Sequence, residues 1–554
     1  MLTGQTPFGR KQAEAPFDSV LSEMPALLHS ILYDTPEPPS RLRKDLTRPV
    51  EQIILKALDK DKSRRYQSMD AVIKDLKAVR SPEIIFPKAE KSIVVLPFED
   101  MSPGKDNEYF CDGMTEEIIT DLSHVHDLLV ISRSSAMTFK GTKKTIPEIA
   151  RAVNVRYVLE GSVRKAGNNL RITAQLIDST NDAHLWADKF AGTLDDVFDI
   201  QENVSRSIVD TLKIRLTSKD RARFAARPIA NAAAYDLHIR ARYEMWQGTE
   251  KGLDCAMEFV QQALAILGEN EILYADMAYL LILYMDAGIK KGEDIFLEAE
   301  EYIRKVFALN SESAYGHYLK GMMSRKRGNT QEAVMEFKKS LALDPANTDS
   351  MMWLGWVYSH SGKTEAARPL VKRLLDIDPL TPLNHFFAGG VSMMEGRFDR
   401  ALEQFQAARR TQEANPMYIY FQAKCLAYSM RLEEGRRLFT IVIKDPPATP
   451  WTQLGSSFVG ALEKNKAEAL WPLSEDFKLL MKGDEIFPIW MAESYALIEE
   501  KSEAIDWIET GVNCGFINYR FLMVYDRFLA NLRSEPRFQK LMERVKYEWE
   551  HFEV

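Results

Sequence analysis

The sequence repeats itself every 34 residues through much of its second half, and this spacing constrains the fold more than any other feature. Each column of residues that keeps the step holds one type of small or turn-forming residue. The columns are Gly321, Gly355 and Gly389; Gly328, Gly362 and Gly396; Ala299, Ala333, Ala367 and Ala401; and Pro345 with Pro379. A fixed period of this length indicates that one short structural unit is repeated along the chain.

The residue types in these columns indicate what the unit is. Small side chains are needed where two antiparallel helices approach closely, and a proline ends the second helix. Phe337 and Phe405 are placed to fill the space between such helices. The unit is therefore predicted to be a helical hairpin that can bury its apolar face only against neighbouring hairpins. We expect about seven or eight hairpins, some of them irregular, over residues 228–548.

This pattern resembles the tetratricopeptide repeat (TPR). One repeat matches the signature of that family well, whereas an earlier repeat has Lys320 where the family prefers leucine. The matching residues are Leu354, Gly355, Tyr358, Gly362, Ala367 and Pro379. The resemblance implies an all-α superhelical solenoid whose concave face, formed by the first helix of each hairpin, binds another protein.

The repeat register predicts which side chains line that concave face. They are Tyr315, Tyr318, Met322, Arg325, Met352, Trp356, His360, Phe386, Met393, Met394, Tyr420, Lys424 and Tyr428. Aromatic and methionine residues outnumber charged ones among them, and such surfaces favour an apolar segment of a partner protein. We therefore predict a peptide-binding groove with Tyr and Trp side chains as its anchors.

Residues 91–217 have the pattern of a small α/β domain. The runs "KSIVVLPF" and "LLVIS" are short, apolar and β-branched, which is typical of buried strands. Three more strands are predicted between Arg156 and Phe190, separated by polar turn residues. In the second of these, Leu170, Ile172, Ala174 and Leu176 alternate with polar residues. The order β-α-β-α-β-β-β, closed by an amphipathic helix, predicts a sheet with helices on a face.

This segment resembles the α/β domain that is similar to the amino-terminal domain of TolB. The stretches that carry the likeness are "VVLPF", "YFCDGMTEEI", "YVLEGSVRKAGNNLRITAQLID" and "HLWADKF". The resemblance implies the fold of the domain and no particular chemistry.

The first segment, residues 1–80, resembles the last part of the C-terminal lobe of bacterial serine/threonine protein kinases. The likeness rests on "MLTGQTPF", "PPSRL" and "ILKALDKDKSRRYQS", with Lys62 where the family usually has proline. It implies that Arg65 is the arginine that pairs with a glutamate of the activation segment in that family. The catalytic motifs of kinases lie upstream of this region and do not occur in the chain. Residues 81–90 are predicted to be a linker.

No motif for catalysis, for a metal or for a cofactor stands out. The hydroxyls of "SRSS", from Ser132 to Ser135, have no neighbouring base in the sequence and are interpreted as structural. Glu116 and Glu117 are consecutive, and we interpret them as charged residues in the first turn of a helix. The predicted catalytic, cofactor and metal sites are therefore none.

Composition and cysteine content indicate the cellular location of the protein and which classes of partner have no support in the sequence. A formal net charge of −8 gives no support for nucleic-acid binding. The longest apolar run, from Met277 to Met285, is about half of the roughly 20 residues that a membrane span needs. The four cysteines are far apart, and no secretory signal precedes the first segment. We therefore predict a cytoplasmic location with reduced thiols and no membrane span.

The parts together predict a multidomain, mainly α-helical interaction protein in bacterial signalling. On this hypothesis the chain does no catalysis and binds a protein partner in the groove of the repeats. The alternative is a truncated form of a serine/threonine kinase whose other modules act as sensors or select substrates. An envelope protein like TolB itself is a third possibility, but it would need an export signal.

Overall fold

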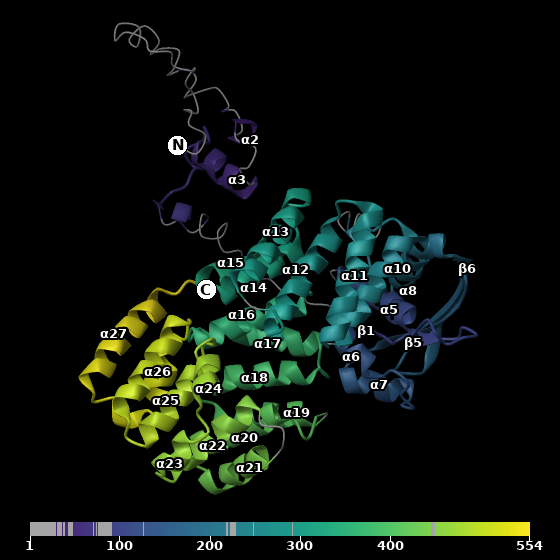
Figure 1. Ribbon diagram of the computed structural model, residues 1–554. Helices are drawn as coiled ribbons and strands as arrows, with labels where there is room; N and C mark the ends of the chain where they lie inside the picture. The colour runs from purple at the N-terminus through teal and green to yellow at the C-terminus, as the bar shows by residue number, and fades with distance from the viewer. Residues whose placement is uncertain are drawn as a thin grey trace. The chain divides into compact units, whose positions relative to one another are not determined.

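The computed structural model describes residues 29, 36, 39–42, 48–69, 71–73, 75, 91–125, 127–217, 220, 221, 229–247, 249–290, 292–410, 412–444 and 449–554. The chain divides into two compact units, Met1–Glu83 and Ile84–Val554. The second unit contains both the α/β domain and the helical array (Figure 1).

The described part of the first unit is a short helical segment. It includes α2 (Pro39–Leu42) and α3 (Arg48–Ala57), and helix resumes at residues 71–73 and 75 after a charged loop, as the apolar spacing predicts. The hydroxyl of Tyr66 donates a hydrogen bond of 2.7 Å to Asp75, which ties the loop to the second helical stretch. The motif "MLTGQTPF", on which the kinase resemblance partly rests, lies outside the described residues.

A six-stranded mixed sheet forms the α/β domain. The strand order is β3-β1-β4-β5-β6, with β2 paired to β4; β1 is parallel to β3 and β4, and the last three strands are antiparallel. The strands are β1 (Lys91–Val95), β2 (Glu99–Asp100), β3 (Leu128–Val130), β4 (Tyr157–Ala166), β5 (Asn169–Asp178) and β6 (Ala183–Thr193). The helices are α5 (Glu108–Ser123), α6 (Arg133–Met137), α7 (Ile146–Val153) and α8 (Val197–Thr211), with a 3-10 turn at Leu194–Asp196.

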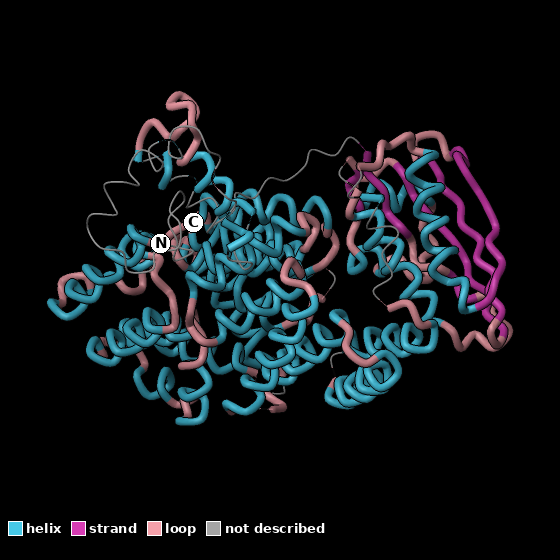
Figure 2. The backbone as a smooth tube through the Cα atoms, turned by 90° about the horizontal axis from the view of Figure 1, so that it is seen from above, coloured by secondary structure: helices cyan, strands magenta, loops and turns pink. Residues whose placement is uncertain are grey.

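The alternation predicted in β5 is confirmed. Leu170, Ile172, Ala174 and Leu176 are all buried, and they share one core with the apolar faces of α5 and α8. Helices lie along one side of the strands in Figure 2. The sequence analysis missed β2 and α6, which are too short to show a hydrophobic period.

The rest of the second unit is an array of antiparallel helix pairs. The described residues contain eight such pairs, followed by a final helix. The pairs are α10 (Ala232–Gln247) with α11 (Glu250–Leu267), α12 (Glu271–Asp286) with α13 (Glu293–Leu309), α14 (Ala314–Lys326) with α15 (Thr330–Leu343), α16 (Thr348–His360) with α17 (Thr364–Ile377), α18 (Pro382–Met394) with α19 (Phe398–Arg409), α20 (Pro416–Tyr428) with α21 (Leu432–Lys444), α22 (Pro450–Leu462) with α23 (Lys466–Leu470), and α25 (Phe487–Leu497) with α26 (Lys501–Asn513). Helix α24 (Glu475–Met481) precedes the last pair, and a π-helical turn at Phe521–Tyr525 and a 3-10 turn at Ala530–Leu532 precede α27 (Pro536–His551).

The two columns of repeated glycines have different structural roles. A Cβ atom at Gly321 or Gly389 would lie within 2.7 Å of the ring of Phe337 or Phe405, so the two helices of these hairpins approach too closely for any larger residue. Gly355, the third member of this column, differs, because a Cβ atom there would be at an ordinary contact distance of 3.8 Å from Val371. The second column, Gly328, Gly362 and Gly396, has φ between +69° and +77°, a conformation that glycine adopts without strain. The predicted helical hairpins are therefore confirmed.

The end of the chain returns to the middle of the array. The indole nitrogen of Trp549 donates to the backbone oxygen of Gly362, and the side-chain amide of Gln331 donates to that of Glu553 at 2.9 Å. The C-terminus accordingly lies close to α15 in Figure 1. In the described parts of the chain, no helix is both long enough and apolar enough to cross a membrane.

Candidate functional site

The predicted groove residues are mostly not accessible to a partner. Of the thirteen predicted residues, four are partly accessible: Tyr315, Arg325, Met352 and Trp356. The other nine are buried: Tyr318, Met322, His360, Phe386, Met393, Met394, Tyr420, Lys424 and Tyr428. The prediction that these buried side chains face an open groove is wrong.

Segments of the chain itself fill the inner face of the later repeats. Ile517 donates its backbone N–H to the carbonyl of His360, and the side-chain amide of Asn518 donates to the carbonyls of Ser359 and Met394. The ring of Phe516 packs against that of His360, with 5.6 Å between ring centroids. Residues 516–518 thus occupy the place that the repeat register left open for a ligand.

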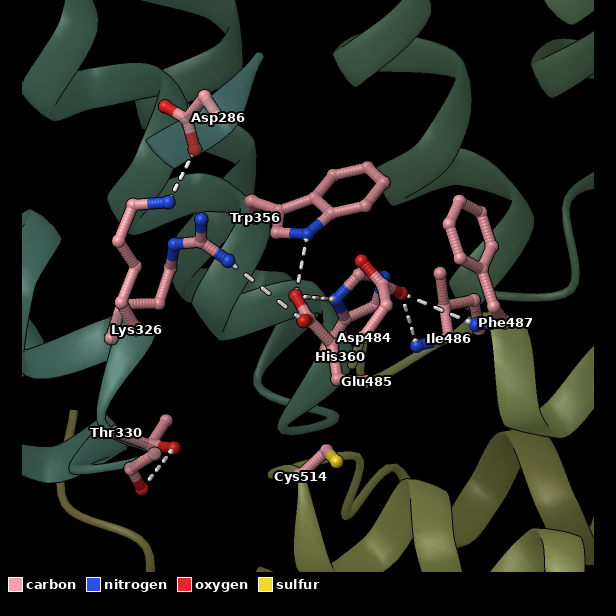
Figure 3. Close-up of polar contacts among 12 residues, drawn as sticks. Asp286, Lys326, Thr330, Trp356, His360, Asp484, Glu485, Ile486, Phe487 and Cys514 are labelled. Carbon is pink, nitrogen blue, oxygen red and sulfur yellow. Dashed lines mark hydrogen bonds and ion pairs between the residues drawn. The ribbon is translucent and has the colours of Figure 1, made fainter. Parts of the chain in front are cut away.

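A second internal contact is centred on Glu485, which precedes α25. Its Oε1 atom accepts a hydrogen bond of 2.8 Å from the indole of Trp356 and lies 3.2 Å from Nδ1 of His360. Arg325 approaches the other oxygen at 3.8 Å. Figure 3 shows Trp356 and His360 directed at this carboxylate. Three predicted ligand-binding residues therefore already contact a carboxylate of the same chain.

The surroundings of Glu485 and its neighbour Asp484 shift the pKa values of the two carboxyl groups in opposite directions. Burial favours the neutral form of Glu485, but the hydrogen bond and charge of His360 and the charge of Arg325 lower its pKa to about 2. Burial and then the charge of Glu485 raise the pKa of Asp484 to about 6. Burial and these carboxylates also raise the pKa of the Cys514 thiol, which keeps it protonated and poorly nucleophilic near neutral pH.

We expect Asp484→Asn to change how stability depends on pH. A raised pKa in the folded chain means that Asp484 favours folding while protonated, so the free energy of unfolding falls as pH rises from about 4 through about 6. The variant should lack this fall and gain on the order of 2 kcal/mol over the wild type between pH 4 and pH 7. Urea denaturation at pH 4, 5, 6 and 7 measures the difference.

Asp476→Asn, which removes an exposed carboxylate of α24, is the matched control and should show no such trend. Parallel profiles for Asp484→Asn and the wild type would contradict the assignment. The lowered pKa of Glu485 acts in the opposite direction, because its stabilising effect is complete above about 4.5 and is lost as pH falls towards 2.

Phe386 belongs to an aromatic cluster inside the array. Its ring lies 4.6 Å from that of Phe421 and 5.7 Å from that of Phe405, and it stacks on Trp356 at 6.0 Å. Truncation of such a side chain removes core packing and typically costs about 3–5 kcal/mol. Substitution of Phe386 therefore tests the stability of the array and not partner binding.

Lys424, Tyr428 and Tyr420 lie still deeper. The ammonium group of Lys424 and the hydroxyl of Tyr428 both bind the carboxylate of Glu493 on α25, and all three side chains are buried. Burial and the charge of Glu493 raise the pKa of nearby Asp526 well above its usual value. The cluster is an internal connection between α20 and α25.

An aromatic surface remains accessible on the inner helices of the earlier repeats. Tyr279 on α12, Tyr315 on α14 and Trp353 on α16 are all partly accessible. The Tyr279 and Tyr315 rings are 6.1 Å apart, and the guanidinium of Arg325 lies 4.2 Å above the Trp353 ring. We call these three aromatic residues, together with Asp349, the aromatic surface.

Asp349 is the charged member of this surface. Its side chain is exposed and has no hydrogen bond or ion pair among the described residues. Surrounding protein atoms nevertheless raise its pKa, and the charge of Arg242 only partly opposes this effect. Asp349 is therefore a carboxylate that has no ion-pair partner among the described residues and lies beside tyrosine rings, a combination that suits a cationic side chain.

The α/β domain contacts the array through partly buried ion pairs. Glu116 on α5 lies 2.7 Å from Arg242 on α10 and 3.0 Å from Arg133 on α6. Although burial raises the pKa of Glu116, the charges of Arg242 and Arg133 lower it overall. Glu116 lies in the second half of α5 and not in its first turn, so the interpretation from sequence is wrong. No local pattern could reveal its partner 126 residues away.

A second contact joins the two parts at α6. The hydroxyl of Ser135 donates to Asp378 and accepts a hydrogen bond of 2.9 Å from the N–H of Leu380, while Ser132 donates its N–H to the carbonyl of Ile377. Through these two serines the "SRSS" stretch attaches the domain to the turn between α17 and α18. In the described residues, no group of three or more His, Cys, Asp or Glu side chains is arranged to hold a metal ion.

The helical array is a tetratricopeptide-repeat array, and an α/β domain precedes it. Residues 293–438 match the family model described as "Tetratricopeptide repeat". Residues 89–209 match the model described as "HilA/YgeH-like transcriptional regulator, second domain". The α/β domain is thus matched as HilA/YgeH-like, whereas the sequence analysis compared it to TolB.

One relative is named "Putative adenylate cyclase 3" and comes from Rhizobium meliloti (strain 1021). It is 46% identical over 159 residues, which is 29% of this chain and 27% of the relative. The chain thus matches about a quarter of the length of this relative. The name refers to a cyclase, whereas the first segment suggested a kinase.

Several solved structures of repeat proteins are also similar. A tetratricopeptide repeat protein from Parabacteroides merdae ATCC 43184 is 11% identical, with 51% of this chain and all of the other covered and a TM-score of 0.34. YrrB, titled "a TPR protein with an unusual peptide-binding site", is 22% identical over 35% of this chain and 95% of its own, with a TM-score of 0.28. MamA from Desulfovibrio magneticus RS-1 is 17% identical over 31% and 93%, with a TM-score of 0.27.

Proposed function

We propose that this chain is a non-catalytic interaction module of a bacterial signalling protein and that it binds a protein segment on the aromatic surface of its earlier repeats. The observation that carries the proposal is that Tyr279, Tyr315 and Trp353 stay accessible there, whereas internal segments fill the inner face of the later repeats. Aromatic side chains of this kind are typical anchors of protein interfaces. The unpaired Asp349 adds a requirement for a lysine or arginine in the bound segment.

A second candidate function is that of a regulatory part of a longer signalling enzyme. The likeness of residues 1–80 to the end of a kinase C-lobe supports this candidate. The match to part of a protein named as an adenylate cyclase also supports it. On this reading the repeats select substrates or sense signals for a catalytic domain that is not in this sequence.

Photo-crosslinking from the aromatic surface tests the first proposal. We expect p-benzoylphenylalanine at position 279 or 315 of the full chain to crosslink one discrete partner in bacterial cells. Asp349→Arg should reduce the yield at least tenfold, because two cations would then face each other on the surface. The readout is the crosslinked band, identified by mass spectrometry.

The same probe at Tyr547, an exposed residue of α27, is the matched control and should give no such band. Equal crosslinking from position 547, or none from either inner position, would contradict the proposed surface. A partner that carries a catalytic domain would favour the second candidate.

A further inference from the structure

One repeat has charged and small side chains where the next repeat has apolar core residues. A step of 34 residues relates Lys320 to Leu354, Ser324 to Tyr358 and Glu336 to Leu370. The three residues of the later repeat are almost completely buried, with exposures of 0%, 2% and 2%. A leucine or tyrosine at each of these positions packs the core of the later hairpin. The earlier hairpin lacks this apolar packing.

A cavity of about 590 Å³ lies at this place, between α13, α14 and α15. Part of its wall is apolar and is formed by Ile303, Phe307 and Met323, and Ser324 contributes a small side chain where a tyrosine would fill the space. Ligand sites in proteins commonly have volumes of about 300–1,000 Å³, with mostly apolar walls and a few convergent polar groups. The cavity has the size of such a site and one apolar side, while the other ten of its thirteen lining residues are polar or charged.

The polar wall is built around a buried carboxylate. Glu336 lies 2.6 Å from Nδ1 of His317, 3.0 Å from the ammonium of Lys339 and 3.2 Å from that of Lys320. Burial favours the neutral form, but hydrogen bonds from His317 and Lys339 and the charges of both lysines lower the pKa of Glu336 to about 2. Glu336 therefore stays charged and holds the two lysines beside the cavity.

Both lysines keep the capacity to bind an additional anion. Lys320 and Lys339 are partly exposed, and an ammonium group can donate three hydrogen bonds. Lys320 already contacts two carboxylates, Glu336 and, at 3.3 Å, Glu332, which leaves one N–H for a ligand. Lys339 makes one hydrogen bond among the described residues, to Glu336. An ionised oxygen at the mouth of the cavity would accept the free N–H groups and form charge-assisted hydrogen bonds.

We propose that this cavity binds a small organic anion, with its charged group at Lys320 and Lys339 and its apolar body against Ile303, Phe307 and Met323. A buried charged cluster is generally no more stabilising than the apolar residues that could replace it, and the next repeat shows that apolar residues fit this position. A bound ligand would fill the space that apolar side chains fill in the next repeat, and this would explain why the earlier repeat lacks them. This site is lined by α13, α14 and α15, contains none of the four residues of the aromatic surface, and does not depend on the proposed partner surface.

Calorimetric titration of the full chain tests the proposal. The probes are naphthalene-2-carboxylate and its neutral analogue naphthalene-2-carboxamide, which have the same apolar body. We expect the carboxylate to bind at least tenfold more tightly than the carboxamide. Lys339→Gln should reduce the affinity for the carboxylate about tenfold, the effect of one lost charge-assisted hydrogen bond, and should leave the carboxamide unaffected.

Two further variants separate binding from folding. Ser324→Tyr introduces the side chain that the next repeat has at this position, so it should fill the cavity and abolish binding while the circular dichroism spectrum is retained. Lys372→Gln, on the exposed face of α17, should bind as the wild type does. The proposal is overturned if neither probe binds at millimolar concentration, if both bind equally, or if a folded Ser324→Tyr variant binds with unchanged affinity.

Discussion

Replacement of Lys424 by alanine should destabilise the array by about 3–5 kcal/mol, because it leaves the buried carboxylate of Glu493 without its counter-charge. Lys424 has no measurable exposure, and its ammonium group also lies 3.8 Å from the centre of the Phe458 ring. Water cannot take the place of the lost cation at this depth. The measurement is the free energy of unfolding in urea at pH 7.

The matched control is the double variant Lys424→Met and Glu493→Leu, which removes both charges and keeps most of the volume. Apolar replacement of a complete buried ion pair is often neutral or stabilising, so the double variant should recover most of the loss. A loss below about 1 kcal/mol for Lys424→Ala, a value typical of exposed pairs, would contradict the buried ion pair. It would also mean that Lys424 is accessible and could bind a partner, as the sequence predicted.

Replacement of Glu116 by alanine should loosen the junction between the α/β domain and the array. Arg242 and Arg133 would then be two cations in a partly buried site without their shared carboxylate, which we expect to cost about 3 kcal/mol. Helices α5 and α10 should exchange their amide hydrogens faster as a result, whereas α16 and α17 should be affected least. Hydrogen exchange followed by mass spectrometry measures this pattern.

Glu108→Ala in the same helix provides the comparison. Glu108 is more than half exposed and pairs with Lys140 at the surface, so its loss should cost no more than about 1 kcal/mol. Equal effects of the two substitutions on α10 would show that Glu116 does not hold the junction. A uniform increase of exchange over the whole array would instead indicate general destabilisation.

The local architecture could be predicted from the sequence because its signals are short-range. The columns at Gly321 and Gly328 report a close helix approach and a left-handed turn within one hairpin. The alternation from Leu170 to Leu176 reports one buried face of one strand. Each pattern reflects forces that act between residues close in the chain or between adjacent repeats.

The sequence predicted the fold of the α/β domain better than it predicted the family of the domain. An α/β domain with the predicted strands and helices in their predicted order along the chain is present, with β2 and α6 in addition, and its family match is to HilA/YgeH-like regulators. A strand pattern defines which faces are buried, and unrelated families share such patterns. The cavity beside Lys320 had one signal in the sequence, the lysine in place of leucine, and the volume that results became visible only from the packing of three helices.

The sequence by itself determined that this protein has an α/β domain followed by stacked helical hairpins, and where the two helices of a hairpin approach closely. Only the tertiary structure decided what lies against the inner face of the repeats. Residues 516–518 and Glu485 come from more than 100 positions later in the chain than the repeats they contact, as the hydrogen bond from Trp356 to Glu485 shows. A repeat register specifies the direction of a side chain, but its burial depends on the superhelical path of the whole array, which sums small rotations between many hairpins.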